Sequence, residues 1–207
     1  MAEAKKHFSM LRTFALADLF TFGNVICGMG AIFACMHQLA TGDPEPLKRA
    51  FWLLPLALFM DGLDGRVARW RQKNSILGAD LDSLADIVSF GVAPTVLGYT
   101  MGMRTLPDMV VFVYFVACGI SRLARFNVTA SALADETGKV KYFEGAPIPT
   151  SLLLVLLLWI QNRQGLSGDA LWGGVLHLGP LEWHAFNAAY LVLGSVMISA
   201  TIRIPKI

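Results

Sequence analysis

The sequence predicts an all-α, polytopic membrane protein built as a bundle of six transmembrane helices. Apolar residues make up 55% of the 207 residues, and the mean hydropathy is +0.56. Both values exceed those usual for a soluble globular chain of this size. Several apolar runs also approach the roughly 20 residues that a helix needs to cross a bilayer. The predicted helices cover residues 14–38, 49–71, 79–100, 107–126, 147–162 and 185–203.

The first predicted helix is distinguished from a secretory signal by its length and by its polar residues Asp18, Thr21 and Asn24. Turn-forming or polar residues separate the later helices. These separators are residues 42–46, 74–75, 129–141 and 165–180. We see no internal repeat, low-complexity tail or soluble domain in the sequence. We therefore expect a single membrane domain over residues 1–207, with a short cytoplasmic N-terminal tail at residues 1–12.

Basic residues are distributed unevenly between the two ends of the predicted helices. If both termini lie on one side, that side carries thirteen of the 17 Lys and Arg residues, and the positive-inside rule makes it cytoplasmic. The thirteen are Lys5, Lys6, Arg12, Arg66, Arg69, Arg71, Lys73, Arg122, Arg125, Lys139, Lys141, Arg203 and Lys206. Because these residues mark helix ends rather than a separate patch, they argue against nucleic-acid binding.

Four aspartates lie within the second and third predicted helices, where charged side chains are costly and usually functional. Asp61 and Asp64 share one face of the second helix, while Asp82 and Asp86 are separated by one turn on the third. At 1.5 Å per residue, Asp64 and Asp86 both lie about 10 Å from the cytoplasmic ends of their helices. An antiparallel helix pair can therefore bring the four carboxylates together.

Such a cluster predicts a metal site for a phosphorylated substrate. Crowded carboxylates repel one another in a low dielectric, and a divalent cation removes this repulsion. Oxygen ligands suit Mg²⁺, Mn²⁺ or Ca²⁺, and two such ions can clamp the attacking and leaving oxygens of a phosphoryl-type displacement. The small residues Gly65, Ala68 and Gly78 leave room for a ligand, and Arg69 can form bidentate hydrogen bonds with a phosphate.

The spacing of these residues resembles the signature of the CDP-alcohol phosphotransferases. The motif reads Asp61-x-x-Asp64-Gly65-x-x-Ala68-Arg69, then eight residues, then Gly78-x-x-x-Asp82-x-x-x-Asp86. The resemblance implies a six-helix membrane fold, usually homodimeric, that moves a phosphate-containing group from a CDP-linked donor to an alcohol and releases CMP. It also implies that all four aspartates hold the metal and that Asp86 is the general base. The four other motif residues would border the CDP group.

Further stretches resemble the phosphatidylserine synthases within this family. They are residues 81–94, 122–127 and 142–150, and residues 198–205 resemble the fungal type. One departure is Ala146, where leucine is expected. The resemblance implies CDP-diacylglycerol as the donor and L-serine as the acceptor. For a eukaryotic source it implies the endoplasmic reticulum membrane, with the active site facing the cytoplasm.

Further site residues follow from the needs of this reaction. We expect Asp86 to accept the hydroxyl proton of serine. The carboxylate of serine needs a cation, and the candidates are Arg122 and Arg125 near the cytoplasmic end of the fourth predicted helix, with Arg125 preferred. Asn24, together with Asp18, is expected to contact the diphosphate or its ligands.

Alternatives exist for these side chains. The aspartates can instead pair with Arg66 and Arg69 as a structural ion network, although a buried ion pair adds little net stability and does not require the glycines. Arg122 and Arg125 can be anchors that reach lipid phosphates. The three cysteines lack metal-ligand spacing and are interpreted as small apolar residues. We assign no role to the four histidines.

Alternatives also exist for the function. The same chemistry can use glycerol-3-phosphate or inositol as the acceptor, and a phosphorylated acceptor should require more cations near the fourth helix. A divalent-cation transporter is a more distant alternative. It would need polar groups continuing toward the opposite face, whereas the second helix is apolar from Asp61 back to Ala50.

Overall fold

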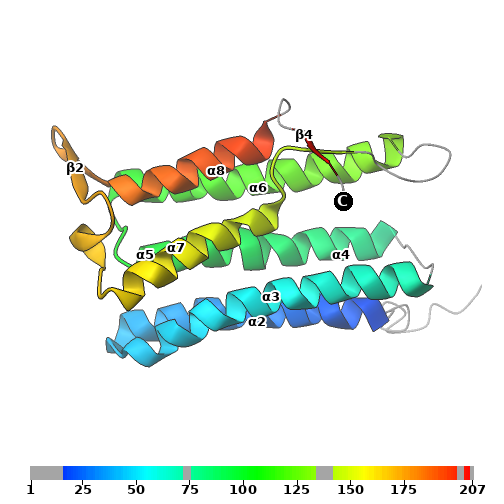
Figure 1. The fold of residues 1–207 in the computed structure, drawn as a ribbon, viewed down its shortest axis with the longest axis horizontal. Coiled ribbons are helices and arrows are strands. Elements are labelled where there is room, and N and C mark those ends of the chain that lie inside the picture. Colours follow the sequence, from blue (N-terminus) through cyan, green and yellow to red (C-terminus); the bar gives the residue numbers. More distant parts are fainter. Residues whose placement is uncertain (1–15, 72–75, 134–141, 200–202, 206–207) are drawn as a thin grey trace, which may run out of the picture.

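The computed structural model describes residues 16–71, 76–133, 142–199 and 203–205, and its helices run side by side in an antiparallel bundle (Figure 1). The α-helices are α2 (Leu16–Thr41), α3 (Pro44–Arg71), α4 (Ile76–Asp86), α5 (Ala93–Thr100), α6 (Leu106–Leu133), α7 (Leu152–Arg163) and α8 (Ala188–Ile198). The π-helix η1 (Ile87–Val92) joins α4 to α5 without a break. The described chain therefore forms six successive helical segments, of which α7 and α8 are much shorter than α6.

Several of these helices are long and apolar enough to cross a membrane. Within the described residues they are the segments Leu19–Thr41, Gly78–Thr100 and Leu106–Val128. Two shorter apolar segments cover Ile148–Arg163 and Ala185–Ile198. Apolar side chains such as Ile26, Trp52 and Val113 also lie exposed on the outside of the bundle. Together these features indicate an integral membrane protein.

The structure confirms that a helix is present in each of the six predicted segments, with changes at some boundaries. The helix predicted from residue 49 begins at Pro44, because a proline in the first helical turn has no hydrogen-bonding amide to lose. The helix predicted to end at residue 126 continues to Leu133. The predicted last helix, 185–203, was too long. α8 ends at Ile198, and residues 203–205 form a strand.

The structure contains short strands that the all-α prediction did not include. β1 (Tyr142–Glu144) pairs antiparallel with β4 (Arg203–Pro205), so residues far apart in the sequence meet where α7 begins. Gly145 follows β1 with a φ of 74°, and a Cβ there would lie 2.2 Å from the carbonyl oxygen of Met197. Only glycine fits this crossing of the chain. β2 (Val175–Leu178) and β3 (Leu181–His184) form a hairpin.

The two ends of the bundle therefore differ, and we name them by their content. The acidic end is where α3 leads toward α4, and β4 and the C-terminal part of α6 lie there too (Figure 1). The hairpin end carries β2 and β3, the junction of α2 with α3 and the end of α7 (Figure 1). Short 3₁₀-helices complete the connections: η2 (Ile148–Ser151) leads into α7, η3 (Gly168–Ala170) lies at the hairpin end, and η4 (Ala185–Asn187) leads into α8.

The core between α5, α6 and α8 is organised around Tyr190, which is fully buried. Its ring packs edge-on against Phe112 and Phe115, with centroid distances of 5.0 and 5.4 Å. Its hydroxyl donates a hydrogen bond of 2.8 Å to the carbonyl oxygen of Pro94. This satisfies the polar atom of an otherwise apolar core and ties α8 to the start of α5.

Candidate metal centre

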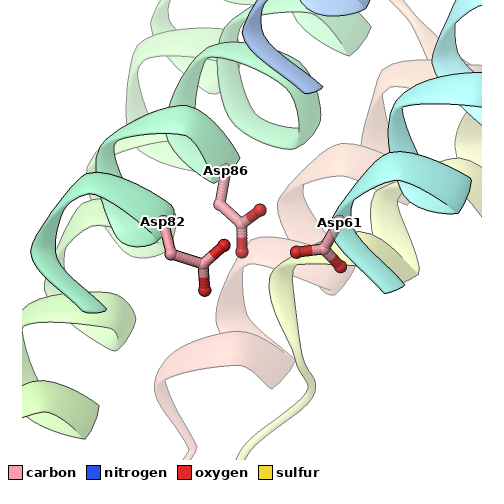
Figure 2. Close-up of side chains that lie close together, drawn as sticks. All are labelled: Asp61, Asp82 and Asp86. Atoms are coloured by element: carbon pink, nitrogen blue, oxygen red, sulfur yellow. The ribbon is translucent and has the colours of Figure 1, made fainter. Parts of the chain in front are cut away.

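Three carboxylates from two neighbouring helices point toward one another at the acidic end (Figure 2). Asp61 projects from α3, and Asp82 and Asp86 project from α4. One oxygen from each can be chosen so that all three atoms lie within 4.8 Å of one another. Asp86 is buried, with 7% of its surface exposed, and the other two are half-buried. The structure thus brings together three of the four aspartates of the motif.

α2 supplies the wall behind this cluster through Asn24, which is fully buried. The Asn24 side-chain amide donates a hydrogen bond of 3.2 Å to an Asp86 oxygen. The backbone carbonyl of Asn24 in turn accepts a hydrogen bond of 3.0 Å from the Ser89 hydroxyl. A Cβ on Gly28 would lie 2.3 Å from that hydroxyl, so the glycine allows α2 to approach this closely. Asn24 is therefore held in place from two helices.

Asp86 is the last residue of α4 before the backbone changes to the π-helix η1. π-Helical turns are rare and occur frequently at functional sites, because the extra residue redirects the side chains that follow. In this chain the change occurs between Asp86 and Ser89, the two residues that contact Asn24. The local backbone thus allows α4 to present its carboxylates while η1 packs against α2.

For several residues expected at the site, only the backbone belongs to the described part of the structure. Asp64, Gly65, Ala68 and Arg69 belong to the C-terminal part of α3, but their side chains lie outside the described residues. The same is true of Asp18 on α2. Gly78 lies in the first turn of α4, on the same helix as Asp82 and Asp86.

The two arginines expected to bind an acceptor differ in their surroundings. Arg122 on α6 is half-buried, and its guanidinium interacts electrostatically with Asp86. It also lies over the ring of Phe126, 5.5 Å from the ring centroid. Arg125 is exposed on the same helix. Of the two arginines, Arg122 is therefore the one whose charge acts on Asp86.

Asn127 is a site residue that the sequence reasoning did not single out. Its side-chain amide lies 3.1 Å from the Ser83 hydroxyl and 3.3 Å from an Asp80 oxygen, so it joins α6 to α4 beside the cluster. Its only signal in the sequence was its place in the stretch 122–127, which resembled other proteins. Asp80 itself is exposed and is not part of the carboxylate cluster.

A further acidic residue, Asp108, is buried at the hairpin end, and the sequence analysis did not single it out. It accepts hydrogen bonds from Thr105 and from the side chain of Asn187, at distances of 2.8 to 3.0 Å. The Nδ1 atom of His184 lies 2.6 Å from Oδ2 of Asp108, the oxygen that also accepts the hydrogen bonds from Thr105. Thr105 is close in the sequence, but His184 and Asn187 are 76 and 79 residues away, so local spacing could not predict the cluster.

The donor set at the acidic end fits a hard divalent cation. Such ions prefer carboxylate and amide oxygens at about 2.0–2.6 Å, so two oxygens on opposite sides of one ion are about 4–5 Å apart. The three carboxylates meet this limit. The Oδ1 atom of Asn24 is buried beside them and has no hydrogen-bond partner within the described part of the chain. It offers a further oxygen to a cation or to a ligand's donor.

Comparison with known proteins agrees with this chemistry. A family model described as CDP-alcohol phosphatidyltransferase matches residues 14–194. The chain belongs to this family. The family predicted from the aspartate motif is thereby confirmed. CDP-alcohol phosphatidyltransferases use a divalent metal, and the convergence of Asp61, Asp82 and Asp86 is compatible with that use.

Three individual relatives share one named activity. The chain is 43% identical to the CDP-diacylglycerol–serine O-phosphatidyltransferase of Saccharomyces cerevisiae, over 97% of this chain and 74% of the yeast protein. The protein of the same name from Helicobacter pylori is 38% identical, over 91% of this chain and 71% of the relative. The protein of the same name from Bacillus subtilis is 34% identical, over 70% of this chain and 75% of the relative. These three relatives come from one fungus and two bacteria.

Proposed function

We propose that the chain transfers the phosphatidyl group of CDP-diacylglycerol to the hydroxyl of L-serine, giving phosphatidylserine and CMP. The observation that carries this proposal is the convergence of Asp61, Asp82 and Asp86 in a member of this family. The activity named for the relatives in yeast and bacteria supports serine as the acceptor. The catalytic unit is the single membrane domain formed by the whole chain.

The cation would be held by Asp61, Asp82 and Asp86, together with Asp64 from the same motif. We propose two ions, with Mg²⁺ or Mn²⁺ as the first candidates and Ca²⁺ as a third. When bound, such ions neutralise the diphosphate of the donor and the charge that develops on departing CMP. The CDP group would lie against Gly65, Ala68, Arg69 and Gly78, and Asn24 would contact the diphosphate.

Asp86 would act as the general base. The serine hydroxyl oxygen attacks the phosphorus that carries the diacylglycerol, its proton passes to Asp86, and the bond from that phosphorus to the oxygen bridging to CMP breaks. The Asn24 amide supports this role because its hydrogen bond to Asp86 fixes the orientation of the carboxylate. Ser89 orients Asn24 in turn.

Arg122 and Arg125 would bind the carboxylate of serine. An arginine can hold a carboxylate through two parallel hydrogen bonds, which also orients the rest of the amino acid. The electrostatic interaction of Arg122 with Asp86 supports a place for Arg122 next to the reacting hydroxyl. Exposed Arg125 would then guide serine from the aqueous side.

The uneven distribution of basic residues supports a multi-pass topology with the acidic end facing the cytoplasm. In a eukaryotic cell this corresponds to the endoplasmic reticulum membrane. CDP-diacylglycerol would enter from the lipid with its diphosphate at the acidic end, while serine would arrive from the cytoplasm. We further propose that the working form is a homodimer.

The reaction can be tested with the purified full chain, CDP-diacylglycerol and a panel of radiolabelled alcohols, with and without EDTA. We expect label to enter phospholipid from L-serine, with one CMP released per product and no product in EDTA. Labelled product from glycerol-3-phosphate or inositol, and none from serine, would overturn the acceptor. Full turnover in EDTA would overturn the role of the metal.

A further inference from the structure

A groove between α3 and α7 at the hairpin end is separate from the acidic cluster. The two helices pack together, and the groove between them has an apolar part of about 220 Å³ and an adjoining polar part of about 360 Å³. Both parts are lined by Phe51, Trp52 and Trp159, so they form one continuous feature. Each is many times the roughly 30 Å³ that one water molecule occupies in the liquid.

The apolar part is suited to an acyl chain. Pro55 on α3 and Val155 and Leu156 on α7 form its walls. Each of these side chains is purely hydrocarbon, so nothing on these walls requires hydration. A groove with such walls on the lipid-facing side of a membrane protein is filled by hydrocarbon rather than water.

The polar part is suited to an anion. It is lined by Lys48 at the start of α3 and by Asn162 and Arg163 at the end of α7. The Arg163 guanidinium lies 5.8 Å from the ring centroid of Trp159, which places its charge at the groove. Within the described residues, Arg163 has no carboxylate partner. Lys48 pairs with Glu45, but both side chains are more than half exposed, and such pairs are weak.

The dimensions match one leaflet of a bilayer. From Arg163 to Leu152, the groove-lining residue furthest along α7, the helix rises about 17 Å. Half of a hydrocarbon core is about 15 Å thick. A lipid with its phosphate at Arg163 would therefore have its acyl chain lying along the apolar part. Trp52 and Trp159 occupy the level where aromatic side chains commonly mark the membrane interface.

We propose that this groove binds an anionic phospholipid of the leaflet at the hairpin end, with the phosphate at Lys48, Asn162 and Arg163 and one acyl chain between α3 and α7. The evidence that selects this occupant is charge complementarity. Two cations and an amide gather at the polar end of an otherwise apolar groove. Asp61, at the acidic end of the same helix, lies thirteen residues from Lys48, about 20 Å away along the axis. The site is therefore distinct from the proposed active site.

Native mass spectrometry of the full chain in detergent micelles can test the headgroup. The micelles are titrated with phosphatidylglycerol or with phosphatidylcholine of the same acyl composition. We expect phosphatidylglycerol to bind more tightly, and Arg163→Gln to weaken it about fivefold, as expected for one basic residue at a membrane surface. Arg49→Gln is the matched control, because Arg49 is exposed at the same end but does not line the groove.

Equal affinity for the two lipids, or equal losses in Arg163→Gln and Arg49→Gln, would overturn the proposal. A second measurement leaves the charged residues of the groove unchanged. In vesicles containing phosphatidylglycerol with brominated acyl chains, we expect stronger quenching of tryptophan fluorescence than with brominated phosphatidylcholine. Trp52→Phe, which removes a groove tryptophan, should reduce this difference, and an unchanged difference would count against the site.

Discussion

Buried acids occur at both ends of this bundle, but their surroundings differ. At the acidic end, Asp61, Asp82 and Asp86 approach one another within 4.8 Å, so negative charge is concentrated in one place. At the hairpin end, Asp108 stands among hydrogen-bond donors from Thr105 and Asn187 and beside the ring of His184. The first arrangement is suited to binding a cation, while the second is already compensated by hydrogen bonds within the protein.

This difference separates a functional acid from a structural one. A single carboxylate surrounded by donors holds secondary-structure elements together, and Asp108 joins α6 to the hairpin and to η4 through residues 76 and 79 positions away. Several carboxylates held against one another reduce stability unless a ligand compensates for the repulsion. Such a cluster is retained where it binds something, which is the physical basis for the metal centre proposed here.

The largest expected effect is that of Asp86→Asn on catalysis. The amide keeps the shape of the side chain but cannot accept the serine proton, so CMP release should fall at least about 100-fold. Binding of CDP-diacylglycerol should change much less, as measured by equilibrium binding of the labelled lipid. Asp80→Asn is the matched control on the same helix, and it should retain most of the activity. Unchanged turnover in Asp86→Asn would remove this residue from the base role.

Asp108→Ala should produce the opposite result, a loss of stability with the chemistry intact. The change leaves the donors of Asn187 and Thr105 buried without their acceptor, which should cost about 3 kcal/mol of unfolding free energy. Thermal unfolding in detergent measures this loss, and the exposed acid Asp169 provides the control Asp169→Asn. If Asp108→Ala stayed fully stable but lost activity per folded molecule, the contrast between the two ends would fail.

Substitution of the two arginines should sharpen the description of the acidic end. Arg122→Ala should raise the KM for serine about tenfold and the KM for CDP-diacylglycerol much less, because it removes a bidentate partner for a carboxylate. The exposed Arg125→Ala should have a smaller effect on the same ratio. Steady-state kinetics with each substrate varied in turn measure both. Equal effects on the two substrates would favour a role for these arginines in membrane anchoring.

The smallest expected effect is that of Asn127→Ala. This change removes the hydrogen bonds that join α6 to Ser83 and Asp80, for a loss of about 1 kcal/mol in stability. Because these contacts lie beside the carboxylates and not among them, affinity for a divalent ion should be nearly unchanged. A large loss of metal affinity would mean that the position of α4 depends on Asn127 more than this geometry implies.

Local patterns in the sequence were sufficient to predict the helices and the convergence of Asp61, Asp82 and Asp86. Long apolar runs predict membrane helices because the bilayer imposes one length and one composition. The spacing of Asp82 and Asp86 places both on one face of a helix, whatever the helix packs against. The prediction that Asp61 joins them required one further assumption, namely that the second and third helices are antiparallel neighbours. Helices joined by a short connection usually are.

Features that depend on distant residues could not be predicted. β4 forms because Arg203–Pro205 lies beside Tyr142–Glu144, and this pairing ended the last helix earlier than its apolar composition suggested. The pairing of Asp108 with His184 joins residues 76 positions apart, so neither the aspartate nor the histidine looked special alone. The contact of Asn24 with Asp86 depends equally on the close approach of α2 to η1.

Binding of Mn²⁺ to the purified full chain, followed by electron paramagnetic resonance, tests the central claim most directly. The account predicts saturable Mn²⁺ binding that is lost in Asp82→Asn and kept in Asp80→Asn, since both residues lie on α4 but only Asp82 belongs to the carboxylate cluster. Equal Mn²⁺ binding by the unmodified chain and by Asp82→Asn would contradict it.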